Sequence, residues 1–529
     1  MTWQDIAVAQ QQHRERTIAA VKPPVPDLPP DLPLNVTSIP AQLLSEEVIA
    51  ITSSTSQALL ERLATGSITS KAVTVAFLQR AGLASRLTNC VTELLPEKAL
   101  ERAAYLDSYY ATHKRSSGPL HGLPISVKEH VGMKGLDLNA GFVSWVGRTA
   151  PDDAIILKLL WNAGAVFYAR TTEPQTLMHL ETSNNIYGVT VNPFNRNLTS
   201  GGSSGGEGSL LGLRGSCLGI GTDIGGSIRS PAANQGVFGL RPTSYRLPLG
   251  GLSATMLGEE QIIPVIGPLS TSLDGVKLFM KAIIDQKPWL VEASMLPFPW
   301  QEPHNLPDGT LLRQGVDGRR KLRVGILADD GVVRPHPPIL RGLRTVVSAL
   351  QEHPEVEVVD FPPYDHAEAW RLISSLYFAD GAAEEREAID ASGEPWRPLS
   401  HFIITNNPGC RARSVPEVWQ MTCEREVYKN AYATHWNRLA SEGGVPIDVV
   451  LCPVGPGCAP PLNSARYWGY TSQWNLLDYP SIVFPTGLSC GRSASTMDKA
   501  DEAYMPRNDD DRFNHELCRL SLETITGRR

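Results

Sequence analysis

The sequence contains no uninterrupted apolar run of about 18 residues or more, which is the length that a membrane-spanning helix requires. Residues 1–16 are polar and carry glutamine, histidine and arginine where a secretory signal would need an apolar stretch. The 8 cysteines are scattered and form no C-x-x-C pair, a pattern that favours buried thiols in a reducing compartment over disulfides or a zinc site. We therefore expect a cytoplasmic protein with no membrane span and no bound metal.

The chain also lacks an excess of positive charge. Its 48 lysines and arginines are outnumbered by 55 aspartates and glutamates, so the formal net charge is -7 and no basic stripe dominates. This balance argues against a nucleic-acid partner. Hydrophobic residues make up 42% of the 529 residues, which is enough apolar surface to bury a large core.

The N-terminal part of the chain combines a proline-rich stretch with two helical patterns. Residues 22–40 are rich in proline and should form an extended arm rather than a helix. Residues 56–63 read as a helix. A second helix should begin at the capping candidates Thr69 and Ser70, because five apolar side chains then share one face: Ala72, Val73, Ala76, Phe77 and Leu83.

From about residue 120 the pattern alternates between short apolar runs and helical segments. Helices are predicted at residues 152–162 and 338–353. The predicted strands are residues 123–127, 165–169, 322–327, 356–361, 449–451 and 481–484. This rhythm predicts an α/β fold in which helices cover both faces of a sheet.

The most informative stretch is a glycine- and serine-rich block at residues 199–229, which contains GGSSGG at 201–206 and GGS at 225–227. Glycine is costly inside regular structure, so these clusters suggest backbone that approaches a ligand closely or adopts unusual angles. A phosphate loop is excluded because no lysine stands at the required place. A dinucleotide fingerprint fails because Ile224 stands where its last glycine belongs.

Other interpretations of this block stay open on composition alone. A nucleophile elbow, G-x-S-x-G, is matched around Ser203 only if the register slips by one residue. A flexible linker is disfavoured by apolar residues that alternate with the glycines, namely Leu210, Leu211, Leu213, Leu218, Ile220 and Ile224. A catalytic loop, a linker and an anion-binding cradle therefore all remain as interpretations.

The block resembles the signature of the amidase signature family, in which GGSSGG is followed by GTDIGGSIR. Ser203 and Ser227 are 24 positions apart, as in the family, and Lys128 precedes Ser203 by the family's usual 75 positions. The likeness covers most of residues 45–490 and is greatest to fungal acetamidases, for example in LHGLPISVKE and WNLLDYPSIVFPTG. Fatty acid amide hydrolases share the core, but they carry an apolar membrane-binding element that this sequence lacks.

The resemblance implies a single large domain of the amidase signature fold, with a central mixed β-sheet. We expect an N-terminal arm at residues 1–50 and a catalytic domain at residues 51–529. Within the catalytic domain, we expect a core at residues 120–250 and peripheral helical insertions at about 330–440.

The resemblance also implies a Ser-cisSer-Lys triad. Ser227 would be the nucleophile, Ser203 would follow a cis peptide bond, and Lys128 would act as a neutral base. A free lysine has a pKa of about 10.4, so that of Lys128 must fall by roughly 3 units. The expected substrate-binding residues, which include the backbone N–H donors of an oxyanion hole, are Ile224, Gly225, Gly226, Ser227, Ser203, Leu177 and Met178.

Supporting roles are expected around this triad. Ser204 and Thr222 can form hydrogen bonds around it, and Asp223 and Arg229 can pair to hold the loop, although a purely structural ion pair fits equally well. Leu177 and Met178 align with the family's acyl-pocket wall, with ordinary core packing as the alternative. His121 is expected to serve in packing rather than catalysis.

The expected activity is hydrolysis of a monocarboxylic acid amide, acetamide-like or a small aryl or alkyl amide, to the carboxylate and ammonia. No cofactor is expected, and a homodimer is a possible assembly.

One alternative is an amidotransferase-type subunit that releases ammonia for a partner. The other is a non-catalytic relative impaired by its altered C-terminus, since residues 512–529 keep the family's Gly-Arg-Arg but match its strand pattern poorly. The closing helix that follows Gly-Arg-Arg in the family is expected to be absent, as in a truncated or wrongly spliced gene end.

Overall fold

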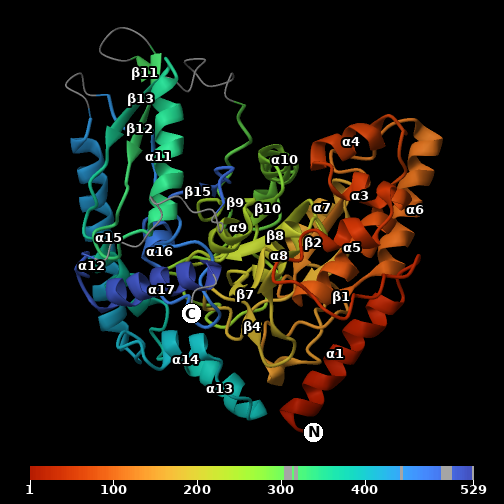
Figure 1. The fold of residues 1–529 in the computed structure, drawn as a ribbon, viewed down its shortest axis with the longest axis horizontal. Coiled ribbons are helices and arrows are strands. Elements are labelled where there is room, and N and C mark those ends of the chain that lie inside the picture. The colour runs from red at the N-terminus through yellow and green to blue at the C-terminus, as the bar shows by residue number, and fades with distance from the viewer. Residues whose placement is uncertain (303–312, 315–319, 441–444, 490–502, 527–529) are drawn as a thin grey trace.

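The computed structural model describes residues 1–302, 313–314, 320–440, 445–489 and 503–526 (Figure 1). Its central feature is a seven-stranded mixed sheet, in which β3, β2 and β8 run parallel and the remaining neighbours pair antiparallel. In spatial order the strands are β1 (Val91–Leu94), β3 (Val166–Thr171), β2 (Pro124–Lys128), β8 (Leu218–Asp223), β10 (Val265–Ser270), β9 (Phe238–Arg241) and β15 (Ser481–Val483).

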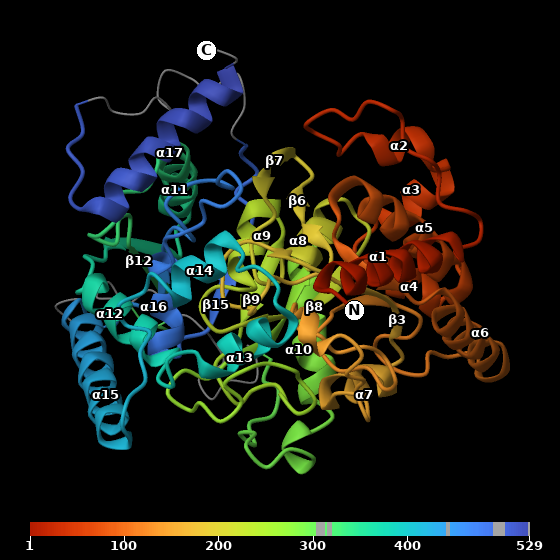
Figure 2. The ribbon, with the colours of Figure 1, turned by 90° about the horizontal axis from the view of Figure 1, so that it is seen from below.

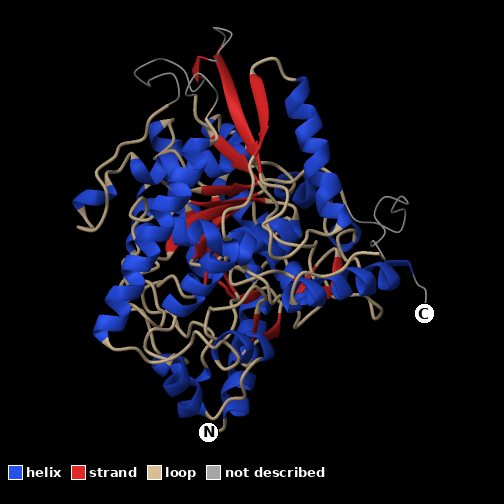
Figure 3. Ribbon diagram, turned by 90° about the vertical axis from the view of Figure 1, so that its left-hand side faces the viewer, coloured by secondary structure: helices blue, strands red, loops and turns tan. Residues whose placement is uncertain are grey.

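A smaller sheet lies to one side of the central one, with a long helix packed beside it (Figures 1 and 3). In this sheet β12 pairs in parallel with both β13 and β14 and antiparallel with β11. Its strands are β11 (Arg313–Gln314), β12 (Arg320–Ile326), β13 (Val356–Asp360) and β14 (Val449–Leu451). Two short hairpins complete the described strands: β4 (Ser183–Asn184) with β5 (Gly188–Val189), and β6 (Val191–Asn192) with β7 (Asn195–Thr199).

Helices surround the strands on either side, as Figure 3 shows, which confirms the predicted α/β class. In the first half of the chain they are α1 (Trp3–Ala19), α2 (Ile39–Leu43), α3 (Glu46–Thr52), α4 (Ser56–Ala64), α5 (Ser70–Thr88), α6 (Pro96–His113), α7 (Ile155–Asn162), α8 (Gly205–Gly212) and α9 (Arg229–Gln235). In the second half they are α10 (Leu273–Ile284), α11 (Pro337–Glu352), α12 (His366–Leu376), α13 (Ala383–Ser392), α14 (Pro398–Ile404), α15 (Val415–Arg438), α16 (Gly469–Leu477) and α17 (Asp509–Thr526).

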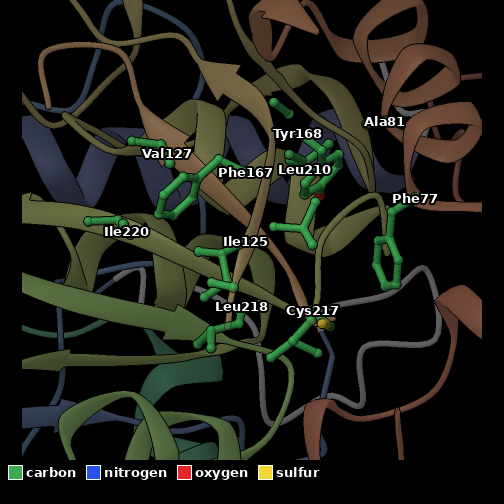
Figure 4. Packing of buried hydrophobic residues seen from close by; sticks show 14 of the residues in the cluster. Phe77, Ala81, Ile125, Val127, Phe167, Tyr168, Leu210, Cys217, Leu218 and Ile220 are labelled. Atoms are coloured by element: carbon green, nitrogen blue, oxygen red, sulfur yellow. The ribbon is translucent and has the colours of Figure 1, made fainter. Parts of the chain in front are cut away.

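The largest hydrophobic core lies where α5 and α8 pack against the central sheet (Figure 4). Ile125 and Val127 of β2 join this core, whereas the intervening Ser126 and the final Lys128 form polar contacts. Successive side chains of a strand point to opposite faces, so this alternation gives β2 one apolar face and one polar face. Phe77 of α5 meets the ring of Tyr168 edge-on.

The predicted elements at residues 56–63 and from residue 70 are α4 and α5, and Thr69 caps α5 as expected by accepting from the Ala72 amide. All six predicted strands occur within two residues of their expected bounds. The helix predicted at 152–162 begins only at Ile155. Its expected first turn is instead a loop, in which Asp153 accepts a hydrogen bond from the Lys134 amide.

The proline-rich segment forms no helix or strand from residue 21 to residue 38, as predicted, and α2 begins at Ile39. The segment packs along α5, because Arg86 of that helix donates hydrogen bonds to the carbonyls of Val25 and Pro26. Helix α1, which precedes it, lies against β1 at the outer edge of the central sheet (Figure 1; Figure 2 shows α1 from below).

The segment whose match to the family's strand pattern is poor lies in a helix, because α17 spans Asp509–Thr526. Three aspartates occupy its first turn, where negative charge favours a helix N-terminus. Leu517 and Cys518 on this helix are buried. The segment with the poor strand pattern is therefore a helix that packs onto the body of the protein.

Candidate active site

Lys128 is the last residue of β2, which is the third of the seven strands of the central sheet (Figure 1). Its side chain is fully buried. Its Nζ lies 2.6 Å from Ser203 Oγ and 3.0 Å from Thr222 Oγ1. Strand β2, the neighbouring β8 and the loop before α8 thus bring together three residues that are separated by as many as 94 positions in the sequence.

Burial lowers the pKa of Lys128 to about 7, because the ammonium form loses its hydration in the interior. The carboxylates of Glu173, Asp223 and Glu207 act in the opposite direction, since each favours the positive charge. Burial dominates, and the amine can therefore be neutral at physiological pH, as the sequence analysis required.

Ser203 follows a cis peptide bond from Gly202, which confirms the expected conformation. Gly202 is held between backbone segments: a Cβ there would lie 2.3 Å from the carbonyl oxygen of Glu181 and 2.5 Å from that of His179. Only glycine fits such a close approach. The chain then turns into α8, and Ser203 directly precedes Ser204, the N-cap residue of this helix.

Ser227 lies in the loop between β8 and α9 and is 6% exposed. Its carbonyl oxygen accepts a hydrogen bond from the Ser204 amide at 3.0 Å, which ties the two serine-bearing loops together. Ser204 Oγ in turn donates to the Thr222 carbonyl and accepts from the Thr222 amide, both at 3.3 Å. Ser204 and Thr222 therefore make the hydrogen bonds that were expected of them.

Asp223 organises the backbone of the Ser227 loop. Its carboxylate accepts from the amides of Gly226 at 2.8 Å and Ile228 at 3.1 Å, and from the guanidinium of Arg229. Despite burial, the Arg229 charge and hydrogen bonds hold the pKa of Asp223 well below its ordinary value. Asp223 and Arg229 therefore hold the backbone of this loop in place and are not an isolated ion pair. Because the Gly226 amide donates to Asp223, it is not available to a ligand.

Two helices from the second half of the chain hold the other side of this loop. Tyr377 Oη, just after α12, donates to the Ile224 carbonyl at 2.8 Å, and Thr471 of α16 donates to the Gly225 carbonyl at 2.7 Å. Because a trans peptide directs its N–H opposite to its C=O, the Gly225 amide points away from Tyr377. Among the described residues, the amides of Ile224, Gly225 and Ser227 have no hydrogen-bond acceptor.

The glycines of this loop are required by space as well as by conformation. Gly226 has a φ of +132°, and a Cβ there would lie 2.4 Å from Thr471 Oγ1. A Cβ on Gly225 would lie 2.7 Å from Tyr377 Oη and 3.0 Å from the Trp468 ring. The helices therefore approach the loop so closely that no larger residue fits without displacement.

Leu177 and Met178 lie in a segment that follows β3. Met178 is buried in an apolar cluster that includes Trp468, and Ile224 packs against the same cluster. Leu177 packs against a separate cluster that contains Phe142. The two residues thus lie on different apolar surfaces, of which only the surface around Met178 reaches the Ser227 loop.

His130, two residues after Lys128, was missed by the sequence analysis. Its Nε2 lies 2.9 Å from Thr222 Oγ1, and its Nδ1 lies 2.8 Å from the Ser253 carbonyl oxygen. Its closeness to the lysine motif was the only signal in the sequence. His121, by contrast, bonds to Ser117 in a loop, in agreement with the expected structural role.

No group of three or more histidine, cysteine, aspartate or glutamate side chains within the described residues could hold a metal ion. In the same part of the chain, no helix has the length and apolar character needed to cross a bilayer.

Comparison with known proteins shows which proteins this chain resembles. A family profile described as Amidase matches residues 72–506. A putative amidase of Schizosaccharomyces pombe is 44% identical over 97% of this chain and 92% of its own length. An acetamidase of Emericella nidulans is 41% identical over 87% of this chain and 82% of its own. The solved structure of a fatty acid amide hydrolase superposes with a TM-score of 0.88 at 33% identity, covering 97% of this chain and 88% of that one.

Proposed function

This chain belongs to the amidase family and is a hydrolase that acts on amides, and we propose that it cleaves monocarboxylic acid amides to the carboxylate and ammonia. The proposed substrates are acetamide-like amides or small aryl or alkyl amides, and the reaction passes through an acyl-enzyme. Relatives named acetamidase, at 41% and 39% identity, support this substrate class.

The observation that carries the proposal is the contact of 2.6 Å between a buried Lys128 Nζ and Ser203 Oγ. A neutral amine at this distance can accept the hydroxyl proton of Ser203. Ser203 then becomes the acceptor for the proton of Ser227, the proposed nucleophile.

In the proposed first step Ser227 Oγ attacks the amide carbonyl carbon while its proton passes to Ser203 and the Ser203 proton passes to Lys128. The carbonyl π electrons move to the oxygen, which accepts hydrogen bonds from the unpaired amides of Ile224, Gly225 and Ser227. Each well-placed donor of this kind contributes about 3–4 kcal/mol to the transition state. The Gly226 amide is left out, since it is bonded to Asp223.

The tetrahedral intermediate collapses when Lys128 returns its proton through Ser203 to the leaving nitrogen. The C–N bond breaks, ammonia departs, and the acyl group stays as an ester on Ser227. Water then attacks this ester by the same proton route, and its hydrolysis releases the carboxylate.

The remaining proposals concern the surroundings of this reaction. Leu177 and Met178 are proposed as walls of the acyl pocket, and Asp223 with Arg229 as the support of the nucleophile loop. We also propose a cytoplasmic location, a homodimer, and the division into an arm at residues 1–50 and a catalytic domain at residues 51–529, with its core at residues 120–250.

The test is ammonia release from acetamide, benzamide and indoleacetamide between pH 6 and pH 10, by the wild type and by Ser227→Ala. Loss of at least about 10³-fold in kcat is expected for the variant. Wild-type activity should rise through about pH 7, where Lys128 loses its proton. Activity of the isolated chain distinguishes an amidase from a subunit that needs partners, and an active Ser227→Ala would contradict the proposed nucleophile.

A further inference from the structure

The His130 side chain is buried and contacts Thr222, which in turn contacts the proposed base Lys128. It is 3% exposed, follows Lys128 by two residues and contacts two oxygen atoms, one at each ring nitrogen. Burial and the nearby charges of Lys128 and Arg170 lower its pKa to about 3, so the ring is neutral at any pH where the enzyme would be assayed. A neutral imidazole carries one N–H and one bare nitrogen.

The backbone decides which nitrogen carries the proton. Nδ1 lies 2.8 Å from the Ser253 carbonyl oxygen, which can only accept a hydrogen bond. Nδ1 must therefore be the donor, and Nε2 is the bare nitrogen. The Ser253 amide also donates to the His130 carbonyl at 2.9 Å, so the loop that bears this acceptor is bonded to the histidine in both directions.

The tautomer then orients the hydroxyl of Thr222. Its Oγ1 is 2.9 Å from the bare His130 Nε2, so the hydroxyl hydrogen points to the ring. Only the lone pairs of Oγ1 remain for Lys128 Nζ at 3.0 Å, and this contact must be an N–H of the amine donating to Thr222.

We propose that His130 is a positioning residue that directs the lone pair of neutral Lys128 toward Ser203. Because Thr222 cannot donate to the amine, the hydroxyl of Ser203 is the donor that remains for the lone pair at 2.6 Å. The chain of hydrogen bonds runs from Ser203 to Lys128, then to Thr222, His130 and the Ser253 carbonyl. Its direction is the one that proton transfer from Ser203 to Lys128 requires.

This inference rests on the proposed function, because it gives a role to Lys128 as the base. Without the His130 acceptor, the Thr222 hydroxyl is free to rotate and donate to the amine. It would then compete with Ser203 for the only lone pair. His130→Leu removes the acceptor, whereas His130→Gln can place an amide oxygen near the position of Nε2 and accept from Thr222.

The kinetic test is a double-mutant cycle with Thr222→Val, which removes the competing hydroxyl while keeping the β-branched shape. We expect His130→Leu to lower kcat/KM by about 10-fold or more in the wild-type background and by less than about 2-fold in Thr222→Val. His130→Gln should retain more activity than His130→Leu. Equal losses in both backgrounds, with melting curves that show folded protein, would overturn the proposal.

A spectroscopic test is independent of turnover. In wild-type protein labelled with ¹⁵N at its 12 histidines, the signal that disappears in His130→Gln should be that of a neutral, Nδ1-protonated ring. An Nε2-protonated or a charged ring would overturn the inference whatever the activity. If the tautomer is as expected but Ser227→Ala stays active, the hydrogen-bond direction holds and the catalytic role assigned to it is refuted.

Discussion

Lys128 shows how one buried residue links reactivity to stability. Its amine can be neutral near pH 7 only because burial removes the hydration of the ammonium form. The unfolded chain keeps the ordinary lysine pKa of about 10.4, so holding this side chain in the folded protein costs about 4 kcal/mol at neutral pH. The hydrogen bonds of Lys128 with Ser203 and Thr222 offset part of this free-energy cost.

This cost predicts a specific pH dependence of stability. Between about pH 7 and pH 10 the unfolded lysine keeps a proton that the folded lysine has released, so unfolding takes up a proton and rising pH favours the folded state. The free energy of unfolding of the wild type should therefore rise relative to that of Lys128→Met, by up to about 4 kcal/mol across this window. Urea denaturation of both proteins at several pH values measures the difference, and parallel pH curves would refute it.

At the scale of elements, the loop between β8 and α9 is held by α16 and by Tyr377 at the end of α12. Gly225→Ala places a methyl group 2.7 Å from Tyr377 Oη and must shift the loop. We expect kcat to fall by about 100-fold or more, since the displaced amides no longer meet the oxyanion. Gly258→Ala is the matched control, because a Cβ at Gly258 meets nothing within 4 Å. An active Gly225→Ala would show that the loop tolerates movement.

Helix α17 allows a second prediction at this scale. The buried carboxylate of Asp511 accepts from the amides of Arg334 and Arg507 and from Tyr504 Oη. Asp511→Ala should lower the free energy of unfolding by about 2–4 kcal/mol, because three partly buried donors lose a charged acceptor. The exposed Asp509→Ala should have little effect. Urea denaturation compares the two variants, and equal stabilities would refute the contribution assigned to the Asp511 contacts.

At the scale of the whole molecule, α1 packs against β1, the edge strand of the central sheet. His13 contacts Glu93 of β1 at 3.0 Å, and the same carboxylate meets the buried Arg170 of β3 at 2.7 Å. Ile18 is buried in the main core. The first helix thus protects both an apolar surface and a buried ion pair of the sheet.

Deletion of residues 2–19 should therefore destabilise the protein. Burial of Ile18 alone contributes about 2–3 kcal/mol, and Glu93 and Arg170 become accessible to water. We expect a melting temperature several degrees lower by calorimetry. His13→Gln, which changes one half-exposed contact and keeps the helix, should cause a much smaller decrease. A truncated protein that melts at the wild-type temperature would show that α1 is not part of the cooperative unit.

The α/β class could be predicted from the sequence alone, and so could the candidate site residues Lys128, Ser203 and Ser227, whose catalytic roles stay a prediction. The period of apolar residues reports burial along one element, and the intervals between the glycine-serine clusters and the lysine are properties of the chain itself. The cap at Thr69 could be predicted for the same reason, because it involves only residues three positions apart. Helix α17 was not predicted, because its segment was compared with a strand pattern rather than read for its own acidic first turn.

Only the tertiary structure revealed the partners of these residues. His130 meets Thr222 across 92 positions, and Thr471 reaches the Gly225 carbonyl across 246. Such contacts leave no periodic pattern, because they depend on which strands and helices become neighbours after folding. The lowered pKa of Lys128 has the same origin: it is set by the loss of water around the amine, which the sequence does not encode at any single position.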